Sequence, residues 1–311
     1  RVLRHHFGNE WVDIVAAPIL SGIYAGDIDR LSLQATYPQL AHMEKTAGSL
    51  VAAAAHLPAP QEKGGLFATL GQGLQTVVDS LSHHLNKTTV YTQTIVQRIH
   101  PAERAGYCVE TSRGKMDVSG VIVAAPAPFA VEMLPFLSAR SQDFMHHIVH
   151  PRLAVVVAQY PLDVLQPFPV KTGFLVPKAS GMHMTAATWV SAKWAYPRVV
   201  PAFVVRTFFG RAGEDVLQAD DEEILRWHQN ELRQIAGIQT DPDDAQVVRI
   251  DPGMPQYAVG HRKQVAGLQE DVAKWPGLAL AGMYLDGVGM PDCVRVATQA
   301  AAQVAGHLLK E

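Results

Sequence analysis

A glycine-rich turn near the C-terminus, Gly282–Cys293 (GMYLDGVGMPDC), is the stretch best suited to chemistry. An apolar run, Leu278–Gly282, leads into it and is typical of a buried strand. Pro291 lies where a helix would begin, because its fixed φ and missing N–H suit the first helical position. The unpaired N–H groups and the positive dipole end of such a helix can bind an anionic group. A tight turn between a strand and a helix accounts for the same residues, so the turn by itself defines no function.

Three other patterns are weaker candidates. His146 and His150 are spaced for one face of a helix, but no acidic ligand follows at a suitable spacing and Pro151 ends the segment, so we predict no metal site. The stretch 71–76 (GQGLQT) begins like a GxGxxG motif but ends in Thr and does not follow a predicted strand. We interpret it as the start of a helix. The acidic run 241–244 (DPDD) is typical of a turn or a helix cap.

The composition is that of a globular protein, with 311 residues, of which 48% are hydrophobic and 18% charged, and a formal net charge of -3. The near-neutral charge and the lack of a long Lys/Arg stripe in the sequence argue against nucleic-acid binding. Two cysteines, Cys108 and Cys293, favour a reduced, cytoplasmic protein. No apolar run is long enough to span a bilayer, so we predict no transmembrane segment, while a peripheral membrane contact stays open. The basic and polar start of the chain is unlike a signal peptide.

The elements expected around the glycine-rich turn are short strands. Val121–Val123 and Leu278–Gly282 are apolar throughout, which is typical of strands buried on both faces in a parallel sheet. A second group is separated by turns without long helices, which favours an antiparallel sheet. This group comprises Leu153–Tyr160, Gly173–Val176, Met184–Val190 and Phe203–Phe209. Further short strands are predicted at Thr88–Ile99, Tyr107–Thr111 and Met116–Val118.

Helices are predicted from amphipathic spacing over Gly8–Leu20, Leu40–Ala55, Leu74–Leu85 and Pro291–Leu309. Another is predicted over Asp220–Ile235, with Asp220 as N-cap and Glu223 in a capping-box position. Segments of parallel character therefore flank a segment of antiparallel character. This order predicts that one domain is interrupted by another.

The stretch Met254–His261 (MPQYAVGH) matches the MPQY-x-VGH motif of bacterial FAD-dependent protoporphyrinogen and coproporphyrinogen oxidases, and the chain resembles this family. Further matches follow in family order, namely Ser21–Ser32 (SGIYAGDIDRLS), Glu44, Gly48 with Ser49, Thr69–Leu74 (TLGQGL), Val123–Pro126 and the glycine-rich turn. The resemblance implies a mixed α/β and α+β fold. In this fold the C-terminal portions of an FAD-binding Rossmann-like domain are interrupted by an antiparallel-sheet substrate domain, with part of a helical domain added.

The resemblance also implies a domain order. Residues 1–60 would end a helical region on the substrate or membrane side, 61–130 and 256–311 would be FAD-domain segments, and 131–255 would be the substrate-binding domain. Family members begin with a βαβ unit that carries GxGxxG, and roughly the first third of such a protein is not in this chain. We expect that third to be cleaved, disordered or omitted, and the 311 residues alone to bind FAD weakly and to be inactive.

For the cofactor, the resemblance implies non-covalent FAD. Val288, Gly289 and Met290 match the flavin-contacting triplet, and Val96 matches a residue whose backbone meets the adenine end. Ile250 lies where relatives often have a flavin-side Trp. A reduced flavin is an anion, which suits the helix start after the glycine-rich turn.

For the reaction, the resemblance implies a six-electron, oxygen-dependent oxidation of a porphyrinogen in haem biosynthesis, with release of H2O2. Leu175, Ala186 and Phe208 match apolar walls for the pyrrole rings, although such a residue on a strand belongs to the core more often than to a ligand wall. Gly22 matches a glycine whose carbonyl takes a proton in the catalytic step.

The substrate branch is suggested by Gly22–Asp29 and by Thr188–Trp194, which resemble the Gram-positive-type enzymes that act on coproporphyrinogen III. The propionates of that substrate require basic partners, for which the candidates are Lys193, Arg206, Arg211 and His261. Two alternatives stay open, namely a protoporphyrinogen IX oxidase of the same family and a flavin-free fragment that only binds a tetrapyrrole. A GxGxxG segment before Arg1 would favour the enzyme.

Overall fold

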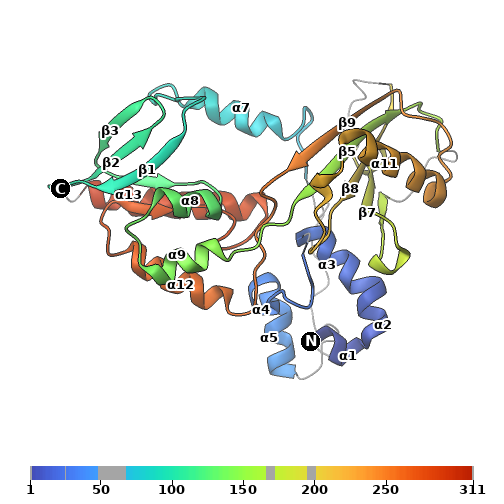
Figure 1. The fold of residues 1–311 in the computed structure, drawn as a ribbon, viewed down its shortest axis with the longest axis horizontal. Helices are drawn as coiled ribbons and strands as arrows, with labels where there is room; N and C mark the ends of the chain where they lie inside the picture. Colours follow the sequence, from blue (N-terminus) through green and yellow to red (C-terminus); the bar gives the residue numbers. More distant parts are fainter. Residues whose placement is uncertain (1, 25, 48–67, 166–171, 195–200, 310–311) are drawn as a thin grey trace. The chain divides into compact units, whose positions relative to one another are not determined.

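The computed structural model describes residues 2–24, 26–47, 68–165, 172–194 and 201–309 (Figure 1). Contacts divide the chain into two units. Unit 1 comprises Arg1–Asp29, Met43–Val90 and Pro151–Gly253, and unit 2 comprises Arg30–His42, Tyr91–His150 and Met254–Glu311. The units interleave along the chain, whereas the predicted ranges 1–60, 61–130, 131–255 and 256–311 are contiguous. The assignment of those ranges to cofactor and substrate stays a prediction.

Unit 1 is built on a five-stranded antiparallel sheet in the order β6-β7-β8-β5-β9. Its strands are β5 (Leu153–Tyr160), β6 (Gly173–Leu175), β7 (Met184–Trp189), β8 (Phe203–Phe209) and β9 (Asp244–Ile250). Four of the five were predicted, and their pairing confirms the antiparallel sheet. The fifth, β9, was missed because polar residues interrupt its apolar positions and most of its side chains are exposed at the sheet edge.

One face of this sheet forms the core of unit 1 together with α11 (Asp221–Ala236). Side chains alternate between the two faces of each strand, so Phe203 and Phe209 of β8 are both fully buried on the core side. Helix α11 begins as predicted, because the Asp220 carboxylate accepts a hydrogen bond of 2.8 Å from the N–H of Glu223. Such a cap contributes about 1 kcal/mol to helix stability.

The N-terminal helices of unit 1 are α1 (Val2–Phe7), α2 (Asn9–Trp11), a π-helical turn at Val12–Ala16, and α3 (Ala17–Tyr24). The helix predicted over Gly8–Leu20 is therefore interrupted by a wider turn. Helix α3 contacts β6 and β7. Short helical turns follow later at Lys178–Ser180, α10 (Val190–Lys193) and Val216–Gln218. Helix α5 (Pro38–Ala47) covers the start of the predicted 40–55 helix, and the rest of that prediction lies outside the described residues.

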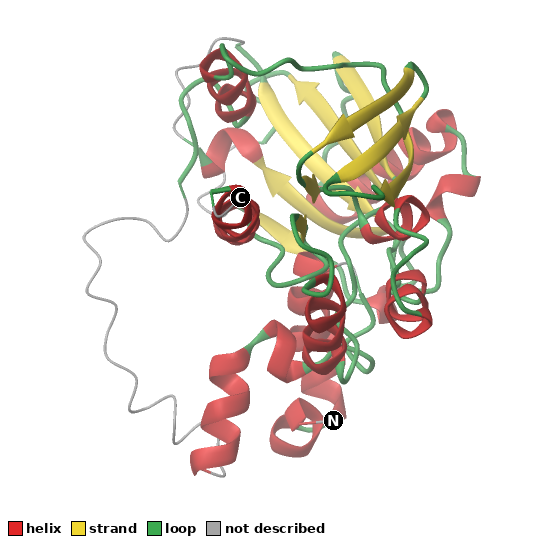
Figure 2. Ribbon diagram, turned by 90° about the vertical axis from the view of Figure 1, so that its left-hand side faces the viewer, coloured by secondary structure: helices red, strands yellow, loops and turns green. Residues whose placement is uncertain are grey.

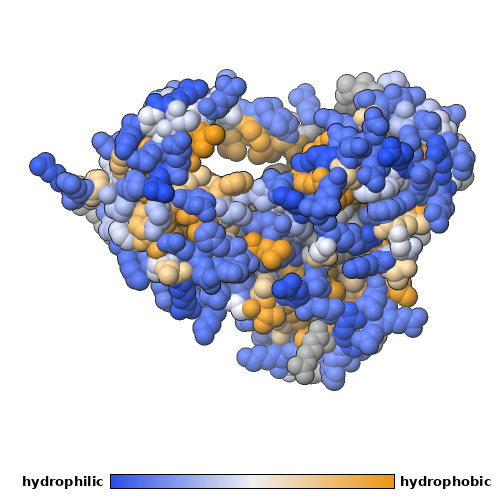
Figure 3. Space-filling model, viewed as in Figure 1, coloured by the Kyte–Doolittle hydropathy of each residue, from blue (hydrophilic) through white to orange (hydrophobic). Residues whose placement is uncertain are grey.

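Helix α7 (Gln75–His84) confirms the predicted amphipathic helix. Its apolar positions are nevertheless open to solvent, since Val78 and Leu81 are 54% and 62% exposed. Figure 3 shows apolar side chains gathered along this helix. An apolar face of this kind is typical of a contact surface.

Unit 2 contains a three-stranded antiparallel sheet and a parallel pair of strands (Figures 1 and 2). The strands are β1 (Val96–Pro101), β2 (Tyr107–Thr111), β3 (Gly114–Val118), β4 (Val121–Val123) and β10 (Leu278–Leu280). Helices α4 (Leu33–Thr36), α8 (Ala127–Met133), α9 (Ala139–His146), α12 (His261–Val272) and α13 (Met290–Leu308) accompany them. The parallel pairing of β4 with β10 confirms the prediction from their apolar runs.

One strand boundary in unit 2 was wrong. The strand predicted from Thr88 begins only at Val96, because threonines favour strands only where a partner strand pairs with them, and β2 first pairs at Val96. Among the described helices, none combines the length and the apolar composition that crossing a bilayer requires.

Candidate functional site

The glycine-rich turn lies in unit 2, between β10 and α13. Gly289 has extended backbone angles (φ −79°, ψ 152°) and precedes the first helical residue, Met290, with Pro291 in the first turn. The first helical hydrogen bond runs from the N–H of Cys293 to the carbonyl of Gly289 (3.0 Å). No side chain of the described residues caps this helix start, so its N–H groups keep the capacity to bind an anionic edge.

Two glycines allow the turn to close onto the first turn of α13. Gly287 has a φ of 84°, and a Cβ there would lie 2.3 Å from Cγ of Asp292. A Cβ at Gly289 would lie 3.3 Å from Oδ2 of the same carboxylate. Arg295 then binds Asp286 (3.0 Å) and Asp292 (3.2 Å), and these carboxylates raise the pKa of Arg295. The turn is therefore tied to its helix, and the charge of Asp292 is partly compensated.

Residues of the motif 254–261 bind the backbone of the glycine-rich turn. The Tyr257 hydroxyl donates a hydrogen bond to the carbonyl of Met283, and the Tyr257 ring stacks on His261 at 4.2 Å. The N–H of Ser32 donates to the carbonyl of Tyr257 (2.7 Å). Burial lowers the pKa of His261 to about 4, so this side chain is neutral at pH 7. A buried, neutral imidazole does not favour His261 among the candidate partners of a propionate.

Tyr284 supplies a second unsatisfied group beside the turn. Its side chain is buried, burial raises the pKa of its phenol, and its hydroxyl has no hydrogen-bond partner within the described part of the chain. Together with the uncapped start of α13, this hydroxyl leaves hydrogen-bonding capacity that a flavin, with its carbonyl and ring-nitrogen edge, could use. The residues of the turn therefore fit a flavin.

The predicted cofactor residues divide between the two units. Val288, Gly289 and Met290 belong to the turn, and Val96 in β1 packs on the same hydrophobic core of unit 2 as Tyr284. Ile250 is at the end of β9 in unit 1, paired with Leu153 and about one-third exposed. The four residues of unit 2 thus share one structural body, and Ile250 does not belong to it.

The three predicted substrate walls form one row across the sheet of unit 1. Leu175 of β6 pairs with Ala186 of β7, and Ala186 pairs with Phe208 of β8. Directly paired residues point to the same face, and this face is opposite the core that α11 covers. The row continues to Val155 of β5. It provides an apolar strip long enough to contact a flat ligand.

Gly22 lies on α3 against this row. A Cβ at Gly22 would lie 3.3 Å from Cδ2 of Leu175, so the helix backbone approaches the sheet closely here. Gly22 is in the last turn of α3. Backbone carbonyls in the last turn of a helix lack an intrahelical N–H partner and can accept a hydrogen bond from another group. The structure therefore brings Gly22 together with the row, although sequence spacing alone placed them more than 150 positions apart.

The other three basic candidates for a propionate contact differ in what their side chains already bind. The Arg206 guanidinium stacks over the Phe208 ring at 4.9 Å, beside the row. Lys193 stacks over Trp194 at 5.3 Å. The Arg211 guanidinium is half-buried and donates to four backbone carbonyls of its own unit. Arg211 therefore holds backbone of its own unit, and this use of its donors does not favour it among the candidate partners of a propionate.

The uncapped helix start and the glycine-rich turn of unit 2 are typical of a flavin-binding strand–turn–helix. The chain belongs to the flavin containing amine oxidoreductase family, whose model matches residues 1–305. The family confirms the flavoprotein resemblance that the sequence motifs predicted.

Named relatives point to one branch of this family. Over 302 residues the chain is 34% identical to "Coproporphyrinogen III oxidase" of Bacillus subtilis, covering 94% of this chain and 63% of that protein. It is 25% identical to "Protoporphyrinogen oxidase, chloroplastic" of Oryza sativa, covering 99% of this chain and 63% of that protein. The chain thus spans less than two thirds of the length of these relatives.

Solved structures agree with this grouping. A structure from Exiguobacterium, provisionally named a protoporphyrinogen oxidase, superposes with a TM-score of 0.85 at 31% identity over 99% of this chain and 66% of the other. Cyclohexylamine oxidase from Brevibacterium oxydans superposes with a TM-score of 0.67 at 16% identity, over 99% of this chain and 67% of the other. The second likeness supports the fold alone.

Proposed function

We propose that this chain is part of an FAD-dependent oxidase that converts coproporphyrinogen III to coproporphyrin III with O2, releasing H2O2, in haem biosynthesis. The observation that carries the proposal is the row of Leu175, Ala186 and Phe208, which Gly22 approaches from α3. A porphyrinogen is a large, mostly apolar macrocycle, and an apolar strip with few polar groups suits it. The name of the Bacillus relative supports the coproporphyrinogen branch.

The chain's residues would contribute binding, orientation and electrostatics. Val288, Gly289, Met290 and the start of α13 would hold the flavin, with Val96 as a further contact. A bound FAD would supply the acceptor for a hydride from a methylene bridge of the substrate. The row would orient the macrocycle, and the Gly22 carbonyl would accept a proton from it.

The test uses the whole protein that the gene encodes, incubated in air with coproporphyrinogen III and with protoporphyrinogen IX. We expect porphyrin fluorescence and H2O2 to appear with both, and faster with coproporphyrinogen III. A flavin-loaded protein that oxidises neither substrate would refute the proposal. A faster reaction with protoporphyrinogen IX would refute the preference, and porphyrin binding without bound flavin would indicate a tetrapyrrole-binding protein instead.

A further inference from the structure

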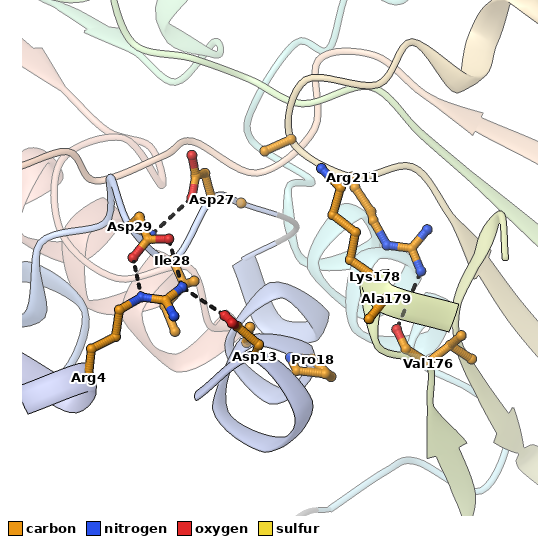
Figure 4. A pocket seen from close by; sticks show the side chains of 13 residues that line it. Arg4, Asp13, Pro18, Asp27, Ile28, Asp29, Val176, Lys178, Ala179 and Arg211 are labelled. Atoms are coloured by element: carbon orange, nitrogen blue, oxygen red, sulfur yellow. Dashed lines mark hydrogen bonds and ion pairs between the residues drawn. The ribbon is translucent and has the colours of Figure 1, made fainter. Parts of the chain in front are cut away.

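A cavity of about 410 Å³ lies within unit 1 (Figure 4). One wall comes from the N-terminal helices and the turn after them, including Arg4, Asp13 and Asp27–Asp29. The other comes from the chain after β6, at Val176–Ala179, and from the residues after β8 at Arg211. Apolar groups such as Pro18 and Ile28 line the space between the charged ones.

The cavity and the row are formed by neighbouring segments of the chain. Gly22 and Leu175 meet where α3 approaches β6. From that contact one segment continues to Gly26–Asp29 and the other to Val176–Ala179, and both line the cavity within a few residues. Leu175 of the row is therefore only three positions along the chain from Lys178 of the cavity.

Most charges in the cavity already have partners. Arg4 binds Asp29 through two hydrogen bonds of 2.9 Å and Asp13 at 2.8 Å (Figure 4). Asp27 accepts a hydrogen bond from the N–H of Asp29 (2.9 Å). The carboxylates of Asp13 and Asp29 are thus held around one guanidinium.

Arg211 fixes the opposite wall. Its guanidinium donates to the carbonyls of Val176 (3.3 Å), Met182 (2.8 Å), His183 (3.2 Å) and Met184 (2.8 Å). These carbonyls flank the turn that joins β6 to β7 on both sides. Burial lowers the pKa of Arg211, but a guanidinium stays charged at physiological pH.

Glu231 of α11 binds backbone N–H groups of the same turn. Its carboxylate is buried and accepts hydrogen bonds from the backbone N–H of His183 (2.8 Å) and of Met184 (2.7 Å). The His183 ring also stacks on Trp227 at 4.0 Å. The turn between β6 and β7 is therefore fixed from two sides by side chains of opposite charge.

Lys178 is a charged residue of the cavity that has no such partner. It begins the short helical turn Lys178–Ser180 within the fixed segment, and its side chain lines the cavity opposite Arg4 and Asp29 (Figure 4). Among the described residues no carboxylate lies within 4.0 Å of its ammonium, and it makes no other hydrogen bond. Because the backbone of this turn is already ordered, only the Lys178 side chain loses entropy when it meets an anion.

We propose that Lys178 binds a carboxylate of the substrate, namely a propionate of the porphyrinogen that lies on the row. This inference rests on the proposed function and adds a polar subsite to it. The fixed turn positions the ammonium, and the cavity has room for the short propionate chain. Lys178 is thereby favoured over Arg211 and His261 as the partner for a propionate.

The test measures binding of coproporphyrin III to the flavin-loaded whole protein by fluorescence quenching. We expect Lys178→Met to raise the Kd about tenfold, as expected for the loss of one charge-assisted hydrogen bond, and Lys178→Arg to restore most of the affinity. The difference between wild type and Lys178→Met should shrink at high salt. Lys87→Met is the matched control, because Lys87 is exposed, lies in a turn of unit 1 and lines no part of the cavity.

Equal affinities for wild type and Lys178→Met, or an equal loss in Lys87→Met, would overturn the inference. Failure of wild type to bind coproporphyrin III would overturn it as well. A separate turnover assay of the wild type keeps the two proposals distinct. Turnover with no Lys178 effect refutes the subsite alone, whereas a Lys178 effect on binding without turnover refutes the oxidase alone.

Discussion

The Tyr257 hydroxyl donates a hydrogen bond to the backbone carbonyl of Met283, at the entry of the glycine-rich turn. The motif 254–261 and the turn are separated by a helix in the sequence, and this bond joins them in unit 2. The ring of Tyr257 is 1% exposed and stacks on His261. The motif therefore stabilises the backbone that precedes the proposed flavin contacts.

Replacing Tyr257 with Phe should lower the free energy of unfolding by about 1 kcal/mol, because a buried carbonyl loses its donor while the ring stack is kept. The proposed flavin should also be retained less tightly. Denaturant unfolding and the flavin-to-protein ratio after dialysis measure the two effects. Tyr91→Phe is the control, since Tyr91 is 55% exposed. Equal stability in the two variants would show that the bond to Met283 contributes nothing.

Replacing Gly287 with Ala should reduce flavin affinity at least tenfold. The positive φ at Gly287 costs about 1 kcal/mol for a residue with a Cβ, and the added methyl would collide with Asp292 and displace the start of α13. Flavin release on dilution, followed by its fluorescence, measures the affinity. Gly181→Ala is the control: Gly181 also has a positive φ (73°) but has open space around it, so this variant should keep the flavin. Loss of flavin in both variants would assign the effect to backbone strain alone.

Replacing Gly22 with Ala should lower kcat/KM for the porphyrinogen about tenfold, which corresponds to ~1.4 kcal/mol. The added methyl would press on Leu175 at 3.3 Å and move the row. Stability should not fall, because Ala is the better helix former. The double variant Gly22→Ala with Leu175→Ala should recover part of the activity. Gly306→Ala, in α13 and without neighbours within 4 Å, is the control. Unchanged kinetics in Gly22→Ala would separate Gly22 from the substrate site.

The fourth prediction concerns a buried histidine of unit 1. His228 is fully buried between α11 and the sheet, with hydrogen bonds to the Tyr160 hydroxyl (2.8 Å) and the Thr207 hydroxyl (2.7 Å). Burial lowers the pKa of His228 to about 4. Between about pH 6.5 and pH 4 the unfolded chain therefore binds a proton that the folded protein does not. Stability is complete above this window and falls as the pH is lowered through it.

Between pH 7 and pH 5 this linkage should reduce the free energy of unfolding by about 2 kcal/mol. His228→Gln removes the titrating group. Over the same pH range its free energy of unfolding should therefore fall by about 2 kcal/mol less than that of the wild type, although the variant is less stable at pH 7. Urea unfolding at the two pH values measures the difference. His147→Gln is the control, because its side chain is 76% exposed. An identical pH dependence in wild type and His228→Gln would contradict the assignment.

The local elements of this protein follow from its sequence because short-range physics decides them. The apolar runs at Val121–Val123 and Leu278–Leu280 can be satisfied only by burial on both faces, and they pair in parallel. Asp220 caps α11 through a bond that spans three residues. The family follows from motifs such as Met254–His261, whose residue order is rare. Strand β9 was not predicted, because an edge strand can be mostly exposed and then shows little hydrophobic periodicity.

Tertiary structure alone decided which residues share a site. Leu175, Ala186 and Phe208 were matched one at a time, and only strand pairing places them in one row. Lys178 and Arg211 are both cationic side chains. The Arg211 guanidinium donates hydrogen bonds to four backbone carbonyls, whereas the Lys178 ammonium has no partner among the described residues. His261 is neutral at pH 7 because packing removes it from water. Charge, burial and hydrogen-bond supply depend on long-range neighbours, and a linear pattern of residue types does not contain those neighbours.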